Sequence, residues 1–300
     1  MKHLLVSALM LGWAVAGNAQ LLNVTSIEKV NTPVSVDRAE ISPDGLSVVV
    51  STNTDRTLQM VNLADGASKT LVAEGSIQGL QFTDDAQKVV YVHRSQDANH
   101  LQYKEVRSLD LASGEQAQLS KPSRNLNGVA VNGANAMVID NKKMQARNLN
   151  GEKVQKAPVA SVYYGQLMIT ENGNTKALNP NGKEGQSYLW PSVSPDGSKV
   201  VYYLANSGCY VCNIDGTGVN FLGNLRAARW MGNDMVIGMR DADNGEFVTE
   251  SAIVAMDLNG NEQVLTGSDV IAMYPAPAEK AGKIAFSTEG GELYVINVAK

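Results

Sequence analysis

The sequence predicts an all-β protein, a β-propeller of four-stranded blades, and three observations lead to that prediction. The turn S-P-D-G followed by a β-branched run occurs twice, at 42–45 and at 194–197. A second turn, in which an apolar strand ends in a short polar segment with Gly, recurs along the chain. Both turns fall in units of about 40 residues, and a four-stranded unit of that length is typical of a propeller blade.

The S-P-D-G turn has a physical reason at each position. Pro43 fixes φ at the second position, Asp44 tolerates the third, and Gly45 makes a positive φ available. The runs that follow the two copies, SVVVS and SKVVYY, are β-branched and aromatic, as a half-buried strand requires. Each turn therefore joins the two strands of a hairpin.

The second turn marks the later part of each unit. It occurs at 60–66, 108–114, 212–216 and 255–260, with weaker copies at 146–151 and 168–173. One more strand fits between the two turns, and a polar strand follows the second. A sandwich of short strands is the alternative, but a sandwich does not need the same turn chemistry in every repeat. We therefore favour the propeller.

The repeat divides the chain into seven units. Their bounds are 36–75, 76–122, 124–158, 159–185, 186–224, 225–269 and 270–300. Residues 124–182 hold seven strand-like pieces, one fewer than two four-stranded blades need. We slightly favour seven blades with one irregular blade. The alternative is six blades, with 124–185 as one blade that contains an inserted hairpin.

The last unit ends after its third strand, so the missing strand has to come from elsewhere. The segment LLNVTSIEKV at 21–30 alternates apolar and polar residues. We expect it to pair there and close the ring, because closure removes exposed strand edges.

The first 19 residues have the features of a cleaved signal peptide. Lys2 and His3 precede an apolar run that is too short for a membrane span, and Gly17 and Ala19 suit cleavage before Gln20. No Cys stands immediately after the cleavage site, so a lipoprotein anchor is not expected. We expect a periplasmic or secreted protein with one propeller domain at 20–300.

The charge balance argues against two classes of partner. The chain has 25 basic and 30 acidic residues, and its formal net charge is −5. No run of basic residues occurs, which is unfavourable for nucleic acid or an anionic membrane as partner. We expect a monomer without a cofactor whose partner is a protein, a peptide or a glycan.

The segments SPDGLSVVV and WPSVSPDGSKVVYY, together with the closing N-L-x-x-G turns, resemble the WD-repeat-like units of TolB-type propellers. The resemblance covers nearly all of residues 36–300. It implies an exported ring with a central channel. Propellers of this type serve as binding modules, peptidase domains and carbohydrate-active enzymes, so the resemblance implies no particular chemistry.

Three features of the sequence bear on catalysis. The G-x-S-x-G elbow of propeller peptidases does not occur in the sequence. His93 and His100 are the two histidines after the signal peptide, fewer than a metal site needs. Cys209 and Cys212 lie in a predicted strand about 10 Å apart, too far for a disulfide. We interpret the histidines as loop residues and the cysteines as small packing residues.

The acidic loop RDADNGEFVTE offers oxygen ligands for Ca²⁺. Its candidate ligands are Asp241, Asp243, Asn244 and Glu246. Gly245 comes one position too early for an EF-hand, and no Glu lies at the required distance. A solvated hairpin loop is the interpretation we favour, so no metal is expected.

The connections that enter the innermost strands form the rim where ligands of this fold usually bind. Aligning the units on their turns places Trp190, Ala227 and Met273 at equivalent points of this rim. We expect partner binding at the channel mouth through Arg38, Trp190, Arg226, Arg229 and Tyr274, since Trp and Arg are common interface anchors. Trp230 is expected in the core between sheets.

The predicted function is therefore a non-catalytic binding or scaffold propeller, with no catalytic residue. The alternative is a carbohydrate-active hydrolase or lyase that uses carboxylates such as Asp37, Glu40 and Asp241 near one rim. A hydrolase would need two carboxylates about 5 to 10 Å apart.

Overall fold

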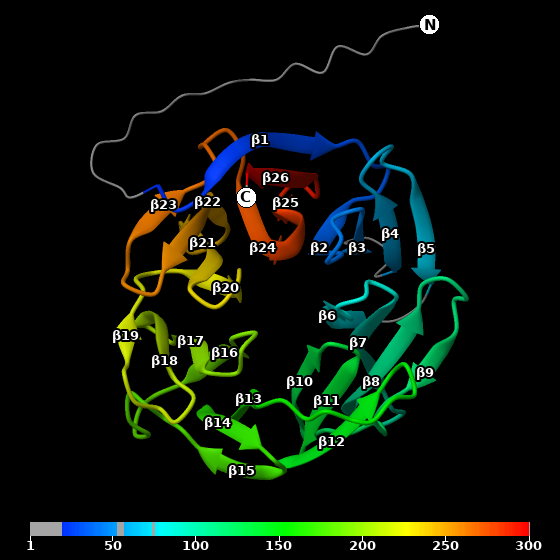
Figure 1. The fold of residues 1–300 in the computed structure, drawn as a ribbon, viewed down its shortest axis with the longest axis vertical. Coiled ribbons are helices and arrows are strands. Elements are labelled where there is room, and N and C mark those ends of the chain that lie inside the picture. The colour runs from blue at the N-terminus through cyan, green and yellow to red at the C-terminus, as the bar shows by residue number, and fades with distance from the viewer. Residues whose placement is uncertain (1–19, 53–56, 74–75, 300) are drawn as a thin grey trace, which may run out of the picture.

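The computed structural model describes residues 20–52, 57–73 and 76–299. Within them the chain forms seven antiparallel β-sheets arranged as a ring (Figure 1). The one described helical element is a 3₁₀ turn, η1 (Glu279–Ala281). The prediction of an all-β propeller with seven blades is confirmed, and the six-bladed alternative is wrong.

Four blades take four strands that are consecutive in sequence. The first has β2 (Val36–Ile41), β3 (Ser47–Thr52), β4 (Leu58–Asn62) and β5 (Ser68–Val72). The second has β6 (Ser76–Phe82), β7 (Lys88–Gln96), β8 (Gln102–Asp110) and β9 (Gln116–Gln118). The fifth has β16 (Tyr188–Val193), β17 (Lys199–Leu204), β18 (Gly208–Asn213) and β19 (Asn220–Phe221). The sixth has β20 (Arg226–Trp230), β21 (Met235–Asp243), β22 (Val248–Asp257) and β23 (Glu262–Val264).

The third and fourth blades have three strands each, where the sequence predicts one irregular blade. The third has β10 (Leu126–Asn132), β11 (Asn135–Asp140) and β12 (Lys143–Asn148). The fourth has β13 (Val159–Tyr163), β14 (Gln166–Glu171) and β15 (Asn174–Ala177). One of the seven predicted pieces, KVQKAPV at 153–159, is not a strand of its own, because residues 153–158 have no regular structure and Val159 begins β13. Six strands rather than seven therefore fill this region, and each blade lacks an outermost strand.

The N-terminal strand completes the seventh blade, as the sequence predicts. This blade has β24 (Ala272–Ala278), β25 (Lys283–Thr288), β26 (Leu293–Ala299) and, outermost, β1 (Asn23–Val30). The pairing of β1 with β26 is antiparallel and runs from Asn23 opposite Ala299 to Val30 opposite Leu293. Leu21, Leu22 and Val24 also pack against the apolar cluster between the sixth and seventh blades. The ring is thus closed by hydrogen bonds and by apolar burial.

Apolar clusters fill the spaces between neighbouring blades. Val49 and Leu58 of the first blade pack with Leu80 and Tyr91 of the second. Along β18, Cys209 and Cys212 are three residues apart and enter two different clusters. Both thiols are free and buried, so the predicted packing role is confirmed. Burial raises the pKa of each thiol to about 12.

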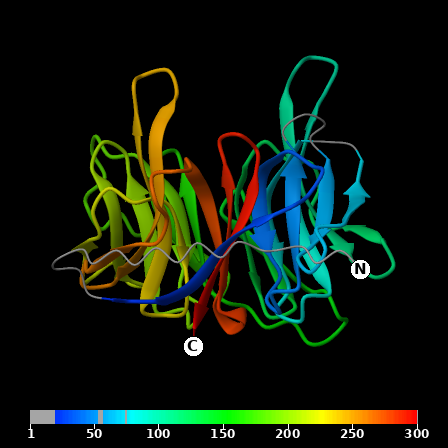
Figure 2. The ribbon, with the colours of Figure 1, turned by 90° about the horizontal axis from the view of Figure 1, so that it is seen from above.

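Two long hairpins project from one face of the ring, β7–β8 and β21–β22 (Figure 2). The pairing of β6 with β7 identifies this face of the ring. Arg94, near the tip of the first hairpin, pairs with Ser76, where the innermost strand β6 begins. The hairpins therefore stand beside the mouth at which the innermost strands enter. None of the described helices has the length and apolar character needed to cross a membrane. The predicted signal peptide lies outside the described residues.

Candidate functional site at the channel mouth

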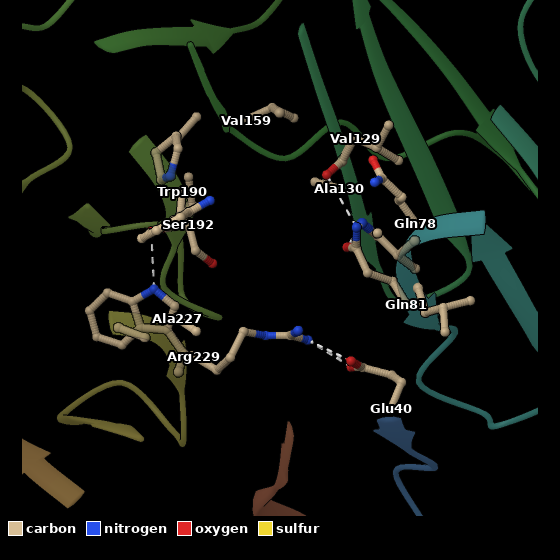
Figure 3. Close-up of a pocket in the computed structure, with 18 of the residues that line it drawn as sticks. Glu40, Gln78, Gln81, Val129, Ala130, Val159, Trp190, Ser192, Ala227 and Arg229 are labelled. Atoms are coloured by element: carbon tan, nitrogen blue, oxygen red, sulfur yellow. Dashed lines mark hydrogen bonds and ion pairs between the residues drawn. The ribbon is translucent and has the colours of Figure 1, made fainter. Parts of the chain in front are cut away.

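The central channel holds a cavity of about 1440 Å³, lined mainly by residues of the innermost strands (Figure 3). The five residues that the sequence singles out for binding all line it: Arg38, Trp190, Arg226, Arg229 and Tyr274. Asp37 and Glu40, two of the carboxylates in the alternative prediction, line it as well. The fold therefore brings residues from four separate blades to one site.

One β-bulge, repeated in four innermost strands, positions the rim of this cavity. In β6, β16, β20 and β24 two residues stand opposite a single residue of the neighbouring strand. The bulged pairs are 79–80, 190–191, 227–228 and 274–275. Pro191 and Pro275 are tolerated at the second bulge position, because a bulge leaves its extra residue outside the hydrogen-bond ladder.

The first residue of each bulge has a positive φ, a backbone conformation that favours glycine. The angles are 61° at Gly79, 48° at Trp190, 51° at Ala227 and 52° at Tyr274. For residues other than glycine this conformation costs about 1 to 3 kcal/mol, and such strain concentrates at functional sites. The predicted equivalence of Met273 with Trp190 is wrong by one residue, since Met273 still pairs with Ser287.

Aromatic rings and guanidinium groups alternate along the rim. In the fifth, sixth, seventh and first blades they are Trp190, Arg226, Tyr274 and Arg38, which we call the mouth arc. The Arg38 guanidinium lies 3.1 Å from the Tyr274 ring centroid, and that of Arg226 lies 5.8 Å from the Trp190 ring. Cations at these positions are attracted by the ring faces. Trp190 nevertheless remains 51% exposed, so its ring is available to a ligand.

Each arginine predicted to bind a partner at the channel mouth forms an ion pair with one of the carboxylates of the alternative prediction. Arg38 Nη1 lies 2.7 Å from Asp37 Oδ1, and Arg226 Nη1 lies 2.6 Å from Asp241 Oδ2. The Asp241 side chain is 3% exposed, whereas that of Arg226 is 41% exposed. The buried carboxylate therefore fixes one edge of Arg226 and leaves the rest of its guanidinium facing solvent.

A third ion pair reaches across the channel (Figure 3). Arg229 Nη2 donates to both carboxylate oxygens of Glu40, at 2.7 and 2.9 Å. The two residues lie on β20 and β2, whose blades are separated by the seventh blade. The Glu40 side chain is 13% exposed. Burial raises the pKa of Glu40, and the positive charge of Arg229 opposes that rise.

The proposed calcium ligands of the β21–β22 hairpin are engaged otherwise. Asp241 binds Arg226, and Asp243 accepts a hydrogen bond from the backbone N–H of Gly245 at 2.9 Å. Asn244 accepts the N–H groups of Glu246 and Phe247 at 3.0 and 3.1 Å. These side chains stabilise the turn, which is why the loop does not present a converging set of oxygens. Nowhere in the described part of the chain do three His, Cys, Asp or Glu side chains gather as a metal ion requires.

Trp230 is half-buried and packs against the apolar cluster between the fifth and sixth blades, as the sequence predicts. It also lines the cavity and donates from Nε1 to the Ser192 carbonyl at 3.0 Å. Two further features of the site, the bulge and Arg94, were not predicted. The bulge itself had a signal, because the aromatic–proline pairs at 190–191 and 274–275 occupy the same place in their units. Arg94 of β7 also lines the cavity and belongs to no recognisable motif.

Together, the fold and this cavity define a seven-bladed propeller with a cationic and aromatic site at its channel mouth. No protein-family model matches the chain, and no curated protein matches it. Among solved structures, the chain is similar to an oligogalacturonate lyase from Vibrio parahaemolyticus, with 12% identity, a TM-score of 0.60, and coverage of 95% of this chain and 97% of that chain. It is also similar to an oligogalacturonate lyase in complex with manganese, with 14% identity, a TM-score of 0.61, and coverage of 95% and 96%.

The comparison contradicts the prediction of a non-catalytic binding module. Both similar structures are lyases, which favours the alternative prediction of a carbohydrate-active enzyme. At these identities the likeness shows the fold alone. The chemistry of this chain therefore has to be argued from its own site.

Proposed function

We propose that this protein is a carbohydrate-active lyase that acts on an oligosaccharide bearing uronate carboxylates, bound at the channel mouth. The observation that carries the proposal is the mouth arc, in which exposed guanidinium groups alternate with aromatic rings over one cavity. Arginine presents paired donors that match a carboxylate. An exposed indole offers an apolar surface for a sugar ring. The similarity to two oligogalacturonate lyases supports the same substrate class.

The reaction proposed is β-elimination. A base removes the proton on C5, next to the uronate carboxylate, and the electron pair forms a C4–C5 double bond. The C4–O bond breaks, and the leaving oxygen gains a proton. Negative charge develops on the carboxylate in the transition state, so a fixed guanidinium that contacts this group lowers the barrier. We assign that contact to Arg226, because Asp241 holds it in place and its outer edge is exposed.

Glu40 is the group that we propose as proton acceptor. Its carboxylate lines the cavity, and burial raises its pKa, which strengthens it as a base when ionised. The contact of Arg229 Nη2 with both carboxylate oxygens favours the ionised form of Glu40 and fixes its orientation. Tyr274 lines the same cavity, under Arg38, and we propose its phenol as the proton donor to the leaving oxygen.

A metal is not part of the proposed mechanism. One similar structure is named as a manganese complex, but the donor set of this chain does not fit such an ion. In the part that the structure describes, His93 lies on β7, His100 lies at the tip of the β7–β8 hairpin, and no cluster of three metal-ligating side chains forms. The steps above therefore use side chains of this chain only.

Two finer features belong to the proposal. The two S-P-D-G turns support a relationship to TolB-type propellers. The features of residues 1–19 support export, so that the enzyme would meet saccharides in the periplasm or outside the cell.

The experiment is a cleavage assay on residues 20–300 with the chelator EDTA present. Oligogalacturonate, its methyl ester and a neutral oligosaccharide are compared through the ultraviolet absorbance of the unsaturated product. We expect activity on the free acid, and a loss of kcat/KM of about 100-fold or more in Arg226→Gln and in Glu40→Gln. The matched control Arg147→Gln removes an exposed arginine outside the cavity. No product from any of the three saccharides would overturn the proposal.

A further inference from the structure

Arg94 of β7 and Lys104 of β8 stand directly opposite each other in the hairpin beside the mouth. Residues paired in this way on antiparallel strands point to the same face of the sheet. Arg94 lines the channel cavity, and both residues are half-buried. The second blade, next to Arg38 of the first, therefore adds two positive charges beyond one end of the mouth arc.

The two cations have no protein counter-ion among the described residues. The ion pairs of that part of the chain include neither of them, and the Nε atom of Arg94 is buried without a hydrogen-bond partner. Burial and the charge of Arg94 both lower the pKa of Lys104. Like charges directly opposite each other destabilise a sheet, so the described residues give this arrangement no structural reason.

The sixth blade shows how the same position is neutralised elsewhere in the ring. Superposing the bulges of the second and sixth blades places Gln78 and Arg226 at equivalent positions of the innermost strands. In the neighbouring strands, Arg94 and Asp241 are then equivalent, because each lies two residues beyond the partner of Gln78 or Arg226. In the sixth blade Asp241 supplies the carboxylate for Arg226 and stands opposite Ser251. In the second blade that position holds an arginine opposite a lysine. Among the described residues of the second blade, no carboxylate therefore takes the place that Asp241 has in the sixth.

We propose that Arg94 and Lys104 form a second anion subsite, which takes the carboxylate of a further uronate in the same oligosaccharide. The inference rests on the proposed function and deepens it. Arg226 and Arg38 hold the acidic sugar at the cleavage site, and the β7–β8 hairpin holds an acidic neighbour. The substrate is then a chain with several acidic residues rather than a single uronate in a neutral polymer.

Calorimetric titration tests the subsite, with Glu40→Gln as background so that the ligand is not consumed. Galacturonate and trigalacturonate are the two ligands. We expect Arg94→Gln to weaken trigalacturonate binding by about tenfold, which corresponds to one charge-assisted hydrogen-bonded contact, and to leave galacturonate binding unchanged. Arg226→Gln is expected to weaken both ligands, and the control Arg147→Gln neither. If Arg94→Gln in the Glu40→Gln background binds trigalacturonate as tightly as Glu40→Gln alone, the subsite is overturned and the proposed function is not. If neither ligand binds, the proposed function and the subsite are both overturned.

A second measurement needs no ligand. Removing one of two opposed like charges relieves their repulsion, so Arg94→Gln and Lys104→Gln should each unfold at a higher temperature than the parent protein, with Arg147→Gln unchanged. A structural role for the two cations predicts the opposite. Lower unfolding temperatures in both variants would therefore contradict the charge argument, whatever the outcome of the titration.

Discussion

At the scale of single residues, the mouth is built from positions that a stable strand would avoid. Trp190, Ala227 and Tyr274 share a positive φ, and two of them present aromatic rings to the cavity. This conformation depends on how the innermost strand pairs with its neighbour, and its one trace in the sequence is the aromatic–proline pair at 190–191 and at 274–275. The residue types were nevertheless informative, since all five predicted binding residues line one cavity.

The strain at the bulge predicts a stabilising substitution. Ala227→Gly removes the side chain from a residue with φ of 51°, so we expect the free energy of unfolding to rise by about 0.5 to 1 kcal/mol. Denaturant unfolding measures the change. The matched control is Ala228→Gly in the same bulge, whose φ is not positive and which should lose about 0.5 to 1 kcal/mol. A loss of stability in Ala227→Gly as large as that in the control would contradict the account of the bulge.

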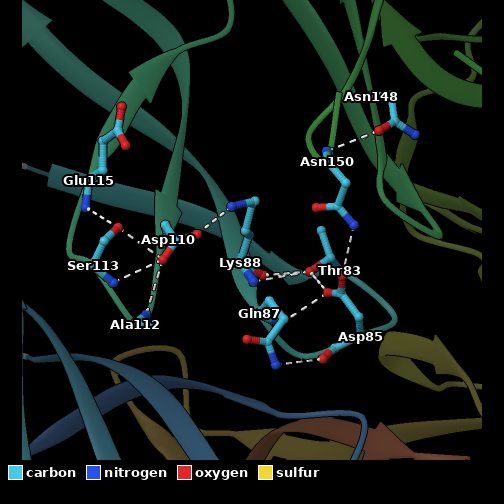
Figure 4. Close-up of polar contacts among 10 residues, drawn as sticks. All are labelled: Thr83, Asp85, Gln87, Lys88, Asp110, Ala112, Ser113, Glu115, Asn148 and Asn150. Atoms are coloured by element: carbon cyan, nitrogen blue, oxygen red, sulfur yellow. Dashed lines mark hydrogen bonds and ion pairs between the residues drawn. The ribbon is translucent and has the colours of Figure 1, made fainter. Parts of the chain in front are cut away.

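Among the structural elements, the hairpin turn shows why two copies could be recognised in the sequence and a third could not. In the two recognised copies a serine hydroxyl binds the turn aspartate, Ser42 to Asp44 at 2.5 Å and Ser194 to Asp196 at 2.6 Å. A third copy lies at 83–86, with sequence TDDA, where the Thr83 hydroxyl binds Asp85 at 2.6 Å (Figure 4). It escaped notice because it has neither Pro nor Gly, and Ala86 takes the positive φ of 58°. Side-chain hydrogen bonds, rather than the Pro–Gly signature, define this turn.

These turns make stability depend on acid pH. Hydrogen bonds from Ser194 and Ser198 lower the pKa of Asp196 below its usual 3.8, and a hydrogen bond from Lys88 lowers that of Asp110 (Figure 4). A folded-state pKa below the unfolded value means that the contribution is complete above about pH 4 and is lost as the pH falls further. Thermal unfolding between about pH 2 and pH 6 should show that loss, and Asp196→Asn should reduce the slope. Asp196→Asn with the slope of the parent protein would contradict this assignment.

For the whole molecule, the sequence predicted the ring, the seven units that each hold one sheet, and the strand that closes the ring. The ring and its units could be predicted because the turns recur at a regular spacing in the sequence. The closing strand could be predicted because the last unit is one strand short. Two short blades in place of one could not be foreseen, because an absent outermost strand leaves no mark on the three strands within it. The prediction of a non-catalytic module is contradicted by the similarity to two lyases, although its site residues do meet at the channel mouth. Arginine and tryptophan at a rim are compatible with a binding surface and with an active site, so residue types did not separate the two functions.

Ring closure by β1 predicts the effect of a truncation. A chain that begins at residue 31 loses the β1–β26 ladder and the packing of Leu21, Leu22 and Val24. We expect a lower unfolding temperature and self-association, because the β26 edge becomes free to pair. Adding a synthetic peptide of residues 21–30 in trans should reverse both effects. Equal unfolding temperatures of the truncated and complete chains would contradict the role given to β1.

A crystal structure of the Glu40→Gln variant with trigalacturonate would show where the saccharide binds. We expect a sugar ring over Trp190, one carboxylate on Arg226 and another between Arg94 and Lys104. Saccharide bound elsewhere on the ring, with the channel mouth free of it, would contradict the account.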